Sequence, residues 1–201
     1  MTPSSFKPNW LQRLEAAGIV FAMAYAIVTG LQWWDLRQNF KIDQRAWVKV
    51  RYQFLPDQLD PKKPLDRWLV VGVNAGKSVA TGVHMKTQFE IVPSSASPSY
   101  SFIKQHGEGD ISPLFPGDDS GFVPAFLEST KTAPRALRAD EIDDLTKGLS
   151  YLAVFGIVTY KDQFGPHWTR FCFWKSFATQ GNFNADSCVE WNTVGDGKPP
   201  N

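Results

Sequence analysis

The sequence predicts a mainly β protein: an antiparallel, immunoglobulin-like β-sandwich preceded by one N-terminal transmembrane helix and a short helical stalk. Three observations lead to this expectation. A run of nineteen residues without Asp, Glu, Lys or Arg lies near the N-terminus. Segments of strand-like polarity separated by turn residues follow it. These segments show no regular alternation of strands with helices, which disfavours a parallel α/β fold.

The apolar run covers residues 16–34 and is long enough to cross a lipid bilayer. At 1.5 Å per helical residue it spans roughly 28 Å, close to the ~30 Å hydrocarbon core. Trp10 precedes the run, and Trp33 and Trp34 close it, as expected for the aromatic belts of a membrane span. Asn9 is placed to cap the helix start. We therefore expect this segment to contact the lipid bilayer as a retained anchor.

Two other interpretations of the apolar run stay open. Ala22-Met23-Ala24 and Ala24-Tyr25-Ala26 both fit the small-x-small pattern of a signal-peptide cleavage site. Cleavage there leaves a short apolar run before the cut, and apolar residues continue after it to Leu31. A buried helix of a soluble core is the second interpretation, but it leaves the flanking Trp residues unexplained.

The charges that flank the run do not set its orientation by themselves. Lys7 and Arg13 precede it, whereas Arg37, Lys41 and Arg45 follow it, so the positive-inside rule does not favour a cytoplasmic N-terminus. The short N-terminal tail, the large C-terminal region and the two cysteines favour a C-terminal domain outside the cytoplasm.

One face of the predicted anchor carries small residues. Ala22, Ala26 and Gly30 lie four residues apart, a spacing that suits close helix packing in membranes. The stripe is therefore a candidate contact for a protein partner or for a homodimer.

The chain is divided into an N-terminal tail, anchor and stalk at 1–44, a β-sandwich domain at 45–192 and a disordered tail at 193–201. Polarity patterns and turn residues predict the elements of the domain. Strands are expected at 46–54, 67–73, 78–92, 99–103, 122–127, 151–160 and 167–177, and a helix capped by Asp140 and ended by Gly148 at 138–148.

Residues 160–172 place His167 and Cys172 five residues apart in a predicted hairpin. Residues an odd number apart in a strand face opposite sides of the sheet, so these two cannot form a catalytic pair without a bulge. His84, His106 and His167 show no local metal-ligand spacing with the cysteines. We therefore expect no catalytic site, metal or cofactor, and we infer no small-molecule ligand.

Cys172 and Cys188 are the two cysteines of the chain. Outside the cytoplasm an even cysteine count favours a disulfide, and closing a loop of this size stabilises a fold by ~3 kcal/mol. Two unlinked thiols are the alternative. In the hairpin turn, we expect Gly165 to adopt a backbone conformation that glycine enters easily, and Asp162 to accept hydrogen bonds from loop amides.

The Gly-Lys-Ser that begins at Gly76 resembles part of a phosphate-binding loop. That motif requires glycine at the position of Val71 and a helix afterwards, and neither is present. Asn74 and Gly76 are therefore interpreted as a hairpin turn with glycine at positive φ. The acidic clusters at 107–110 and 117–121 do not match a calcium loop. A net charge of +1 gives no indication of nucleic-acid binding.

The strands expected at 151–160 and 167–177 carry apolar side chains on both faces. An outer sandwich face is normally polar, so we expect these strands to be covered on both sides. The segment 93–135 of the same chain is the preferred cover, and a partner is the alternative, since a sizeable exposed apolar patch usually marks an interaction site.

Three motifs in the sequence each match a pattern found in one known family. Arg45 to Val48 fits Arg-Ala-(Trp/Tyr)-Val, Asn74 to Ala80 fits Asn-x-Gly-(Lys/Gln)-(Thr/Ser)-x-Ala, and Tyr160 to Cys172 fits Tyr-x-Asp-x-Phe-Gly-x-x-His-x-Thr-x-Phe-Cys. The hairpin motif residues are Tyr160, Asp162, Phe164, Gly165, His167, Thr169 and Cys172. The pattern resembles an uncharacterised bacterial family whose members look like single-pass membrane proteins. This resemblance implies a bacterial inner-membrane protein of the cell envelope and adds no reaction.

We expect a membrane-anchored, non-enzymatic β-sandwich that binds or scaffolds an unknown partner in the envelope. One alternative is an accessory subunit of a larger membrane complex. Another is an envelope hydrolase or metal-dependent enzyme that uses His167 and Asp162. The enzyme needs a concave site in which these two side chains and a third polar group converge.

Overall fold

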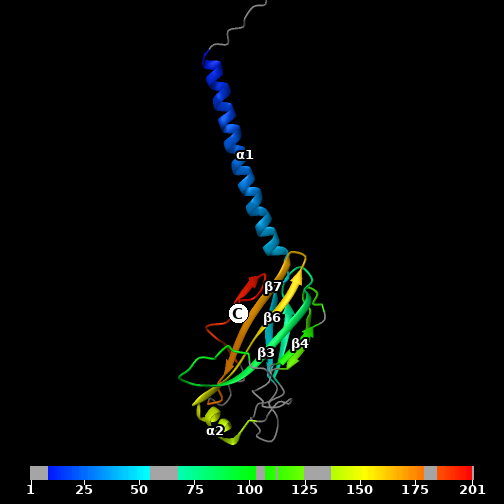
Figure 1. The fold of residues 1–201 in the computed structure, drawn as a ribbon, viewed down its shortest axis with the longest axis vertical. Coiled ribbons are helices and arrows are strands. Elements are labelled where there is room, and N and C mark those ends of the chain that lie inside the picture. Colours follow the sequence, from blue (N-terminus) through cyan, green and yellow to red (C-terminus); the bar gives the residue numbers. More distant parts are fainter. Residues whose placement is uncertain are drawn as a thin grey trace, which may run out of the picture. The chain divides into compact units, whose positions relative to one another are not determined.

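A computed structural model of the chain describes residues 9–54, 68–102, 107–111, 113–124, 137–178 and 185–200. The chain divides into two compact units, Met1–Asp43 and Gln44–Asn201. The first contains the N-terminal helix, and the second contains antiparallel β-sheets and one short helix (Figure 1).

The N-terminal helix, α1 (Asn9–Gln44), has 36 residues. Its stretch Arg13–Gln44 is, within the described parts of the chain, the one helix long and apolar enough to cross a membrane. Large apolar side chains lie exposed along it, among them Phe21 and Tyr25, each about three-quarters exposed. Such a continuous apolar surface is normally covered by lipid or by protein. A helix of this kind near the N-terminus indicates a membrane or a secreted protein.

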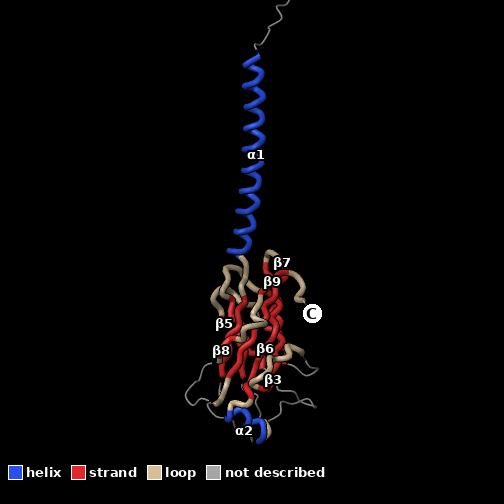
Figure 2. The backbone as a smooth tube through the Cα atoms, turned by 90° about the vertical axis from the view of Figure 1, so that its left-hand side faces the viewer, coloured by secondary structure: helices blue, strands red, loops and turns tan. Residues whose placement is uncertain are grey.

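The second unit contains two antiparallel sheets (Figure 2). The smaller sheet has the strand order β1-β2-β5, and the larger has the order β4-β3-β6-β7-β8 with β9 also paired to β7. The bounds are β1 (Val48–Phe54), β2 (Trp68–Asn74), β3 (Thr81–Pro93), β4 (Gly107–Ile111), β5 (Asp119–Pro124), β6 (Ser150–Asp162), β7 (Gly165–Lys175), β8 (Asp186–Ser187) and β9 (Val194–Asp196).

One hydrophobic core contains side chains from both sheets. Val48 and Val70 of the smaller sheet belong to it together with Met85 and Leu152 of the larger one, all less than 3% exposed. Each such side chain contributes about 1.5–3 kcal/mol by leaving water. Residues 152–156 of β6 are all buried, which agrees with the expectation that this strand is covered on both faces. In β3, burial alternates from Val83 to Thr87 because every second side chain reaches this core.

The short helix α2 (Ala139–Lys147) ends as predicted but begins differently. Gly148 terminates it with a left-handed φ of 74°, a conformation that glycine adopts without steric cost. Arg138, rather than the predicted Asp140, occupies the N-cap, and its amide donates to the Glu141 carboxylate at 2.8 Å. The sequence rule favoured Asp140 because Asp is a common N-cap, whereas here the carboxylate three residues after the cap makes the bond.

The hairpin formed by β6 and β7 is tighter than expected. Asp162 pairs directly with Gly165 and Tyr160 pairs with His167, so only two residues form the turn. Gly165 has a φ of 134°, which confirms the prediction of a backbone conformation that favours glycine.

The connection after β2 is not the predicted hairpin turn. β2 and β3 belong to different sheets, so the chain crosses between sheets here. Gly76 is not among the glycines with positive φ. A Cβ at Gly76 would instead lie 2.4 Å from the Arg45 carbonyl oxygen and from the Trp47 amide nitrogen. Glycine is needed because another backbone segment passes against it, which local turn statistics do not reveal.

The outer face of the larger sheet is covered by the same chain, in part by the segment 93–135 that the sequence analysis preferred and in part by a C-terminal segment. Residues 94–102 and 185–200 are named here the cover (Figure 1). In the second of these, β8 and β9 pair with β7, and Trp191 between them stacks on Tyr100 of the first. Tyr100 and Phe102 contact Phe155 of β6, with ring centroids 5.6 and 5.7 Å apart. Phe155 is fully buried as a result. The strand expected at 99–103 is irregular over its described residues 99–102.

The C-terminal part of the cover differs from the expected disordered tail. β9 pairs with β7, with Trp168 opposite Gly195 and His167 opposite Asp196. Gly195 permits this pairing, because a Cβ there would lie 2.4 Å from the Trp168 ring. A stretch rich in Gly and Pro has few sequence signals for a strand. Residues 194–196 form a strand because they pair with β7.

Candidate functional site

The three motifs of the sequence meet where the chain enters the β domain. Four charged side chains form the centre of this meeting point: Arg45, Asp162, His167 and Asp196, named here the junction cluster. His167 Nε2 lies 2.8 Å from Asp162 Oδ1, and its Nδ1 lies 2.7 Å from Asp196 Oδ1. Arg45 Nη1 donates to the same Asp196 oxygen at 2.9 Å. Sequence reasoning placed His167 at the mouth of a loop, but it is buried at 4% exposure.

His167 lies between two carboxylates. Both of its ring nitrogens face carboxylate oxygens, and a carboxylate accepts a hydrogen bond from a ring nitrogen that carries a proton. Arg45 adds a cation beside Asp196, whose side chain is 69% exposed, whereas the side chain of Asp162 is fully buried. Asp162 therefore depends most on its partners, since an unpaired buried charge is strongly destabilising.

Asp162 is the member of the cluster with the most partners. Its Oδ2 accepts from the Ala46 amide at 2.8 Å, and its Oδ1 accepts from the Phe164 amide at 2.7 Å. The side chain is fully buried. Burial alone raises the pKa of Asp162, but the hydrogen bonds from Ala46, His167 and Phe164 and the charge of His167 outweigh it. The pKa of Asp162 is therefore lowered, and the carboxylate stays ionised.

The other motif residues join β1 to the rest of the domain. Asn74 Oδ1 accepts from the Trp47 and Gly76 amides at 3.3 and 2.9 Å. Tyr160 donates its hydroxyl to the Ala46 carbonyl at 3.3 Å, and Thr169 donates to the Val48 carbonyl at 2.8 Å. Each polar motif residue thus bonds main-chain atoms of a different segment. Their common task is to hold the start of β1.

This arrangement does not suit acid–base catalysis. A catalytic base needs a nitrogen within hydrogen-bond reach of its substrate, and both nitrogens of His167 are engaged by carboxylates. The Ser78 hydroxyl donates to Asp162 at 3.4 Å. Asp162, His167 and a third polar group, Asp196, do converge, but the ring they surround is 4% exposed. Within the described ranges, no group of three His, Cys, Asp or Glu is arranged to hold a metal.

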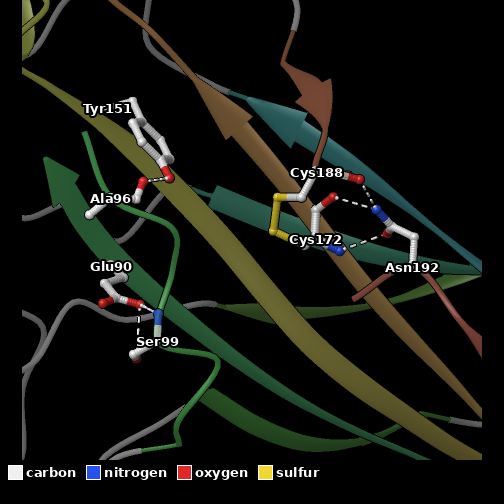
Figure 3. The surroundings of a disulfide bond; sticks show 7 residues. All are labelled: Glu90, Ala96, Ser99, Tyr151, Cys172, Cys188 and Asn192. Atoms are coloured by element: carbon white, nitrogen blue, oxygen red, sulfur yellow. Dashed lines mark hydrogen bonds between the residues drawn. A yellow bond between two sulfur atoms is a disulfide. The ribbon is translucent and has the colours of Figure 1, made fainter. Parts of the chain in front are cut away.

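Cys172 and Cys188 form a disulfide, with their Cα atoms 5.3 Å apart (Figure 3). Asn192 fixes the cover beside it, because its side chain accepts from the Cys172 amide at 2.9 Å and donates to the Cys188 carbonyl at 2.7 Å. Figure 3 also shows the other part of the cover. There the Ser99 amide donates a hydrogen bond to the Glu90 carboxylate, and the Tyr151 hydroxyl donates one to the Ala96 carbonyl. The predicted pairing of the cysteines is thus present, and it suits a domain outside the cytoplasm.

The two parts of the cover meet at a pair of stacked rings. Tyr100 and Trp191 have centroids 4.8 Å apart and an interplanar angle of 7°. They are also the two non-glycine residues with positive φ in the described chain, at 53° and 68°. Bulky residues avoid this region unless the surrounding structure imposes it. The guanidinium of Arg170 lies 4.0 Å from the centroid of Trp191, a cation–π contact.

Clefts open on both sides of this ring pair. One of about 460 Å³ is lined by Tyr151, Trp174 and the disulfide residue Cys188. The other, of about 670 Å³, is lined by Phe102, Arg170 and further residues of the cover. Both volumes fall within the range of ligand sites. The sequence analysis found neither cleft, because apart from Cys172 its motif residues lie on the inner side of the hairpin or at its turn.

The remaining predicted residues lie apart from both regions. Ala22, Ala26 and Gly30 are exposed on α1. His84 bonds Glu108 and Asp110 of β4 at 2.7 and 2.8 Å. His106 and the predicted strand residues 125–127 lie outside the described residues. Sequence reasoning missed Asp196, which lay in the supposed tail, and it assigned no pairing role to Arg45.

Comparisons with family models, curated proteins and solved structures found no match to this chain. The structure itself defines the class: a chain with an N-terminal helix of membrane-spanning length and a disulfide-bonded domain of antiparallel sheets.

Proposed function

We propose that this chain is a single-pass protein of the bacterial inner membrane whose β domain lies outside the cytoplasm and binds or scaffolds another envelope component without catalysis. The observation that carries the proposal is the presence in one chain of an exposed apolar helix and a disulfide-bonded domain. The helix needs lipid to cover it. The disulfide needs an oxidising compartment. The resemblance of the three motifs to a bacterial family adds the envelope.

The strand order supports an immunoglobulin-like sandwich as the fold of this binding module. If β1, β2 and β5 correspond to strands A, B and E, then β3, β6 and β7 correspond to C, F and G. β4 then takes the place of the additional strand that variable-type domains append beside C. Sandwiches of this class bind partners through surface loops and sheet faces, and many have no catalytic activity.

The junction cluster supports a scaffolding rather than a catalytic role. It links the residues just before β1 to the hairpin and to β9 through partly buried hydrogen bonds. A tethered binding domain needs a firm attachment at this point, whereas an enzyme needs an open nitrogen or nucleophile. If the partner is itself a membrane protein, the chain is an accessory subunit of a larger membrane complex.

Cysteine labelling in intact cells tests the location. In a Cys172→Ala/Cys188→Ala chain, a single cysteine at the exposed Lys147 should react with a membrane-impermeant maleimide before lysis. A single cysteine at Ser5 should react only after lysis. The reverse pattern contradicts an external domain, and loss of the unmodified chain from washed membranes contradicts the retained anchor.

Photo-crosslinking from intact membranes tests the binding role. A photoreactive residue at Ser97 or Val189, both exposed in the cover, should give a discrete adduct of reproducible mass. The same residue at Asp143 on α2 serves as the control. Equal or absent adducts at all three positions contradict a binding function of this face.

A further inference from the structure

The larger cleft, named here the proline cleft, lies on the outer face of the larger sheet. Its apolar lining comes from Ile157 of β6 and from the rings of Phe102 and Trp191. Arg170 of β7 and Lys198 add positive charge to the lining. An aromatic cleft with a few polar groups on a rigid sheet is the usual form of a binding site.

The chain places its own proline-containing segment at this cleft. Lys198, Pro199 and Pro200 form part of the lining, and Arg170 Nη2 donates a hydrogen bond to the Pro200 carbonyl. Proline has no N–H, so residues 199 and 200 cannot pair with β7 as a strand does. Recognition by an aromatic surface and a donor to a carbonyl is the manner in which proline-rich peptides are bound.

The proline cleft is surrounded by hydrogen-bond donors without acceptors. Arg170 Nε and Trp191 Nε1 are buried and find no partner among the described residues. Buried donors without acceptors are costly and rare in folded proteins. Both are donors, so a ligand that reached them would complement them with acceptors such as main-chain carbonyls.

The walls of the proline cleft are also conformationally strained. Tyr100 and Trp191 hold positive φ angles of 53° and 68° and stack on each other. Such strain is maintained where the surrounding structure fixes it, and it concentrates at functional sites. The anchors of the cover supply this restraint: the disulfide at Cys188 before Trp191, and the Asp196 bonds after it.

The same anchors limit what can move. Asp196 is held by His167 and Arg45, and the Gly197 amide donates to the Pro166 carbonyl at 2.8 Å. After Gly197, Arg170 Nη2 donates to the Pro200 carbonyl. The contacts of the junction cluster involve Asp196 and earlier residues, so residues 198–200 can leave the cleft while those contacts stay in place.

We propose that the proline cleft binds an extended, proline-containing segment of a partner protein, and that Lys198–Pro200 occupies part of this site until the partner displaces it. The inference rests on the proposed binding function and names the chemistry of its partner. Arg170 donates to a carbonyl of the incoming segment, and the rings of Phe102, Tyr100 and Trp191 contact its prolines.

A peptide-binding measurement on the full chain in detergent tests this proposal. The probe is a fluorescein-labelled Gly-Lys-Pro-Pro-Asn peptide, followed by anisotropy. A variant with Lys198→Ser, Pro199→Gly and Pro200→Ser should bind it at least tenfold more tightly than the unmodified chain, because the internal competitor is gone. Adding Arg170→Gln should abolish binding, whereas adding Lys147→Gln, an exposed cation on α2, should leave it unchanged.

Three results overturn the proposal, provided that far-ultraviolet circular dichroism and the disulfide are unchanged. The first is no binding by the segment variant. The second is equal binding of a Gly-Lys-Ala-Ala-Asn peptide. The third is equal binding after Arg170→Gln. Binding of chitooligosaccharides without peptide binding also overturns the proposal and assigns the cleft to glycans. Concentration-dependent dimerisation that is lost in the segment variant overturns it too, and assigns the cleft to a second copy of the chain.

The peptide-binding test and the crosslinking test distinguish failure of the proline cleft from failure of the proposed binding function. If the peptide fails but the crosslinked adduct at the cover persists, the binding role survives and the proline cleft does not. If the adduct is absent as well, both proposals fail.

Discussion

The junction cluster and the proline cleft use polar groups in different ways. At the centre of the junction cluster, the buried polar atoms of Asp162 and His167 bond partners on other segments. At the proline cleft, Arg170 and Trp191 keep buried donors without acceptors among the described residues, and Trp191 also has positive φ. Arg45 of the junction cluster keeps one such donor, its Nε, so the two regions differ in the bonding of their central groups, although both involve the same strand, β7, and the same segment of cover.

This difference indicates separate tasks for the two faces of the hairpin. Satisfied buried networks define one arrangement and resist change. Regions that keep strain and unmet donors gain free energy when a ligand supplies what is missing. The motifs that stand out in the sequence therefore contribute to how the domain is built, whereas the proposed binding site uses less conspicuous residues on the outer face.

The largest expected effect comes from breaking the junction cluster. Asp162→Ala leaves His167 Nε2 and the Ala46 and Phe164 amides without their carboxylate partner. Removing one partner of a buried ion pair costs about 3–5 kcal/mol. Chemical unfolding of the full chain in detergent, followed by near-ultraviolet circular dichroism, measures the change.

Asp110→Ala is the matched control for this substitution. It removes a similar carboxylate–histidine contact with His84, but the Asp110 side chain is 89% exposed. Exposed pairs contribute about 0–1 kcal/mol. Equal losses for the two variants contradict the special importance of the junction cluster.

The next effect is that of removing the disulfide. The double variant Cys172→Ala/Cys188→Ala opens a loop with a sequence separation of 16 and should lower the free energy of unfolding by about 3 kcal/mol. Hydrogen exchange should rise most at the cover near Asn192. The Ala46 and Phe164 amides of the junction should change least, and a uniform rise across both regions contradicts their independence.

The sequence predicted the elements whose signals are local. Alternating polarity revealed β1, strand-like runs between turn residues revealed β2, β3, β6 and β7, a charge-free run revealed α1, and Gly165 revealed the hairpin turn. The disulfide followed from the cysteine count. These features depend on neighbours along the chain, which a single sequence displays directly.

Features that depend on distant contacts were missed or misjudged. Gly76 was assigned to positive φ, but it is needed because the backbone at Arg45 passes against it. Asp196 was placed in a disordered tail because Gly and Pro surround it, yet it bonds His167, 29 residues earlier. Tyr100 and Trp191 lie in irregular segments, so no periodicity marks their stacking. Tertiary contacts override local pattern at each of these positions.

The pH dependence of stability provides a smaller test of the junction cluster. The pKa of Asp162 is lowered from 3.8 in the folded domain by its hydrogen bonds and by His167. Below 3.8 the unfolded state therefore binds a proton first, so the stabilisation is fully present above 3.8 and is lost as pH falls through the lower folded pKa. Unfolding measured from about pH 2 to 6 should show this loss in the unmodified chain. It should be weaker in Asp162→Asn, and identical profiles contradict the assignment.

The smallest effect separates backbone strain from packing at the hairpin that both regions share. Gly165 has a φ of 134° and open space where a Cβ would lie, so Gly165→Ala adds no clash and costs only the unfavourable backbone angle. We expect a loss of about 1 kcal/mol, measured by chemical unfolding. Gly72→Ala is the control, because Gly72 has no positive φ and its Cβ would make ordinary contacts, the nearest at 3.5 Å to Ile111. That variant should change stability by less than about 0.5 kcal/mol. Equal effects would show that the hairpin turn tolerates a side chain, and that the junction cluster holds His167 without help from the geometry of the turn.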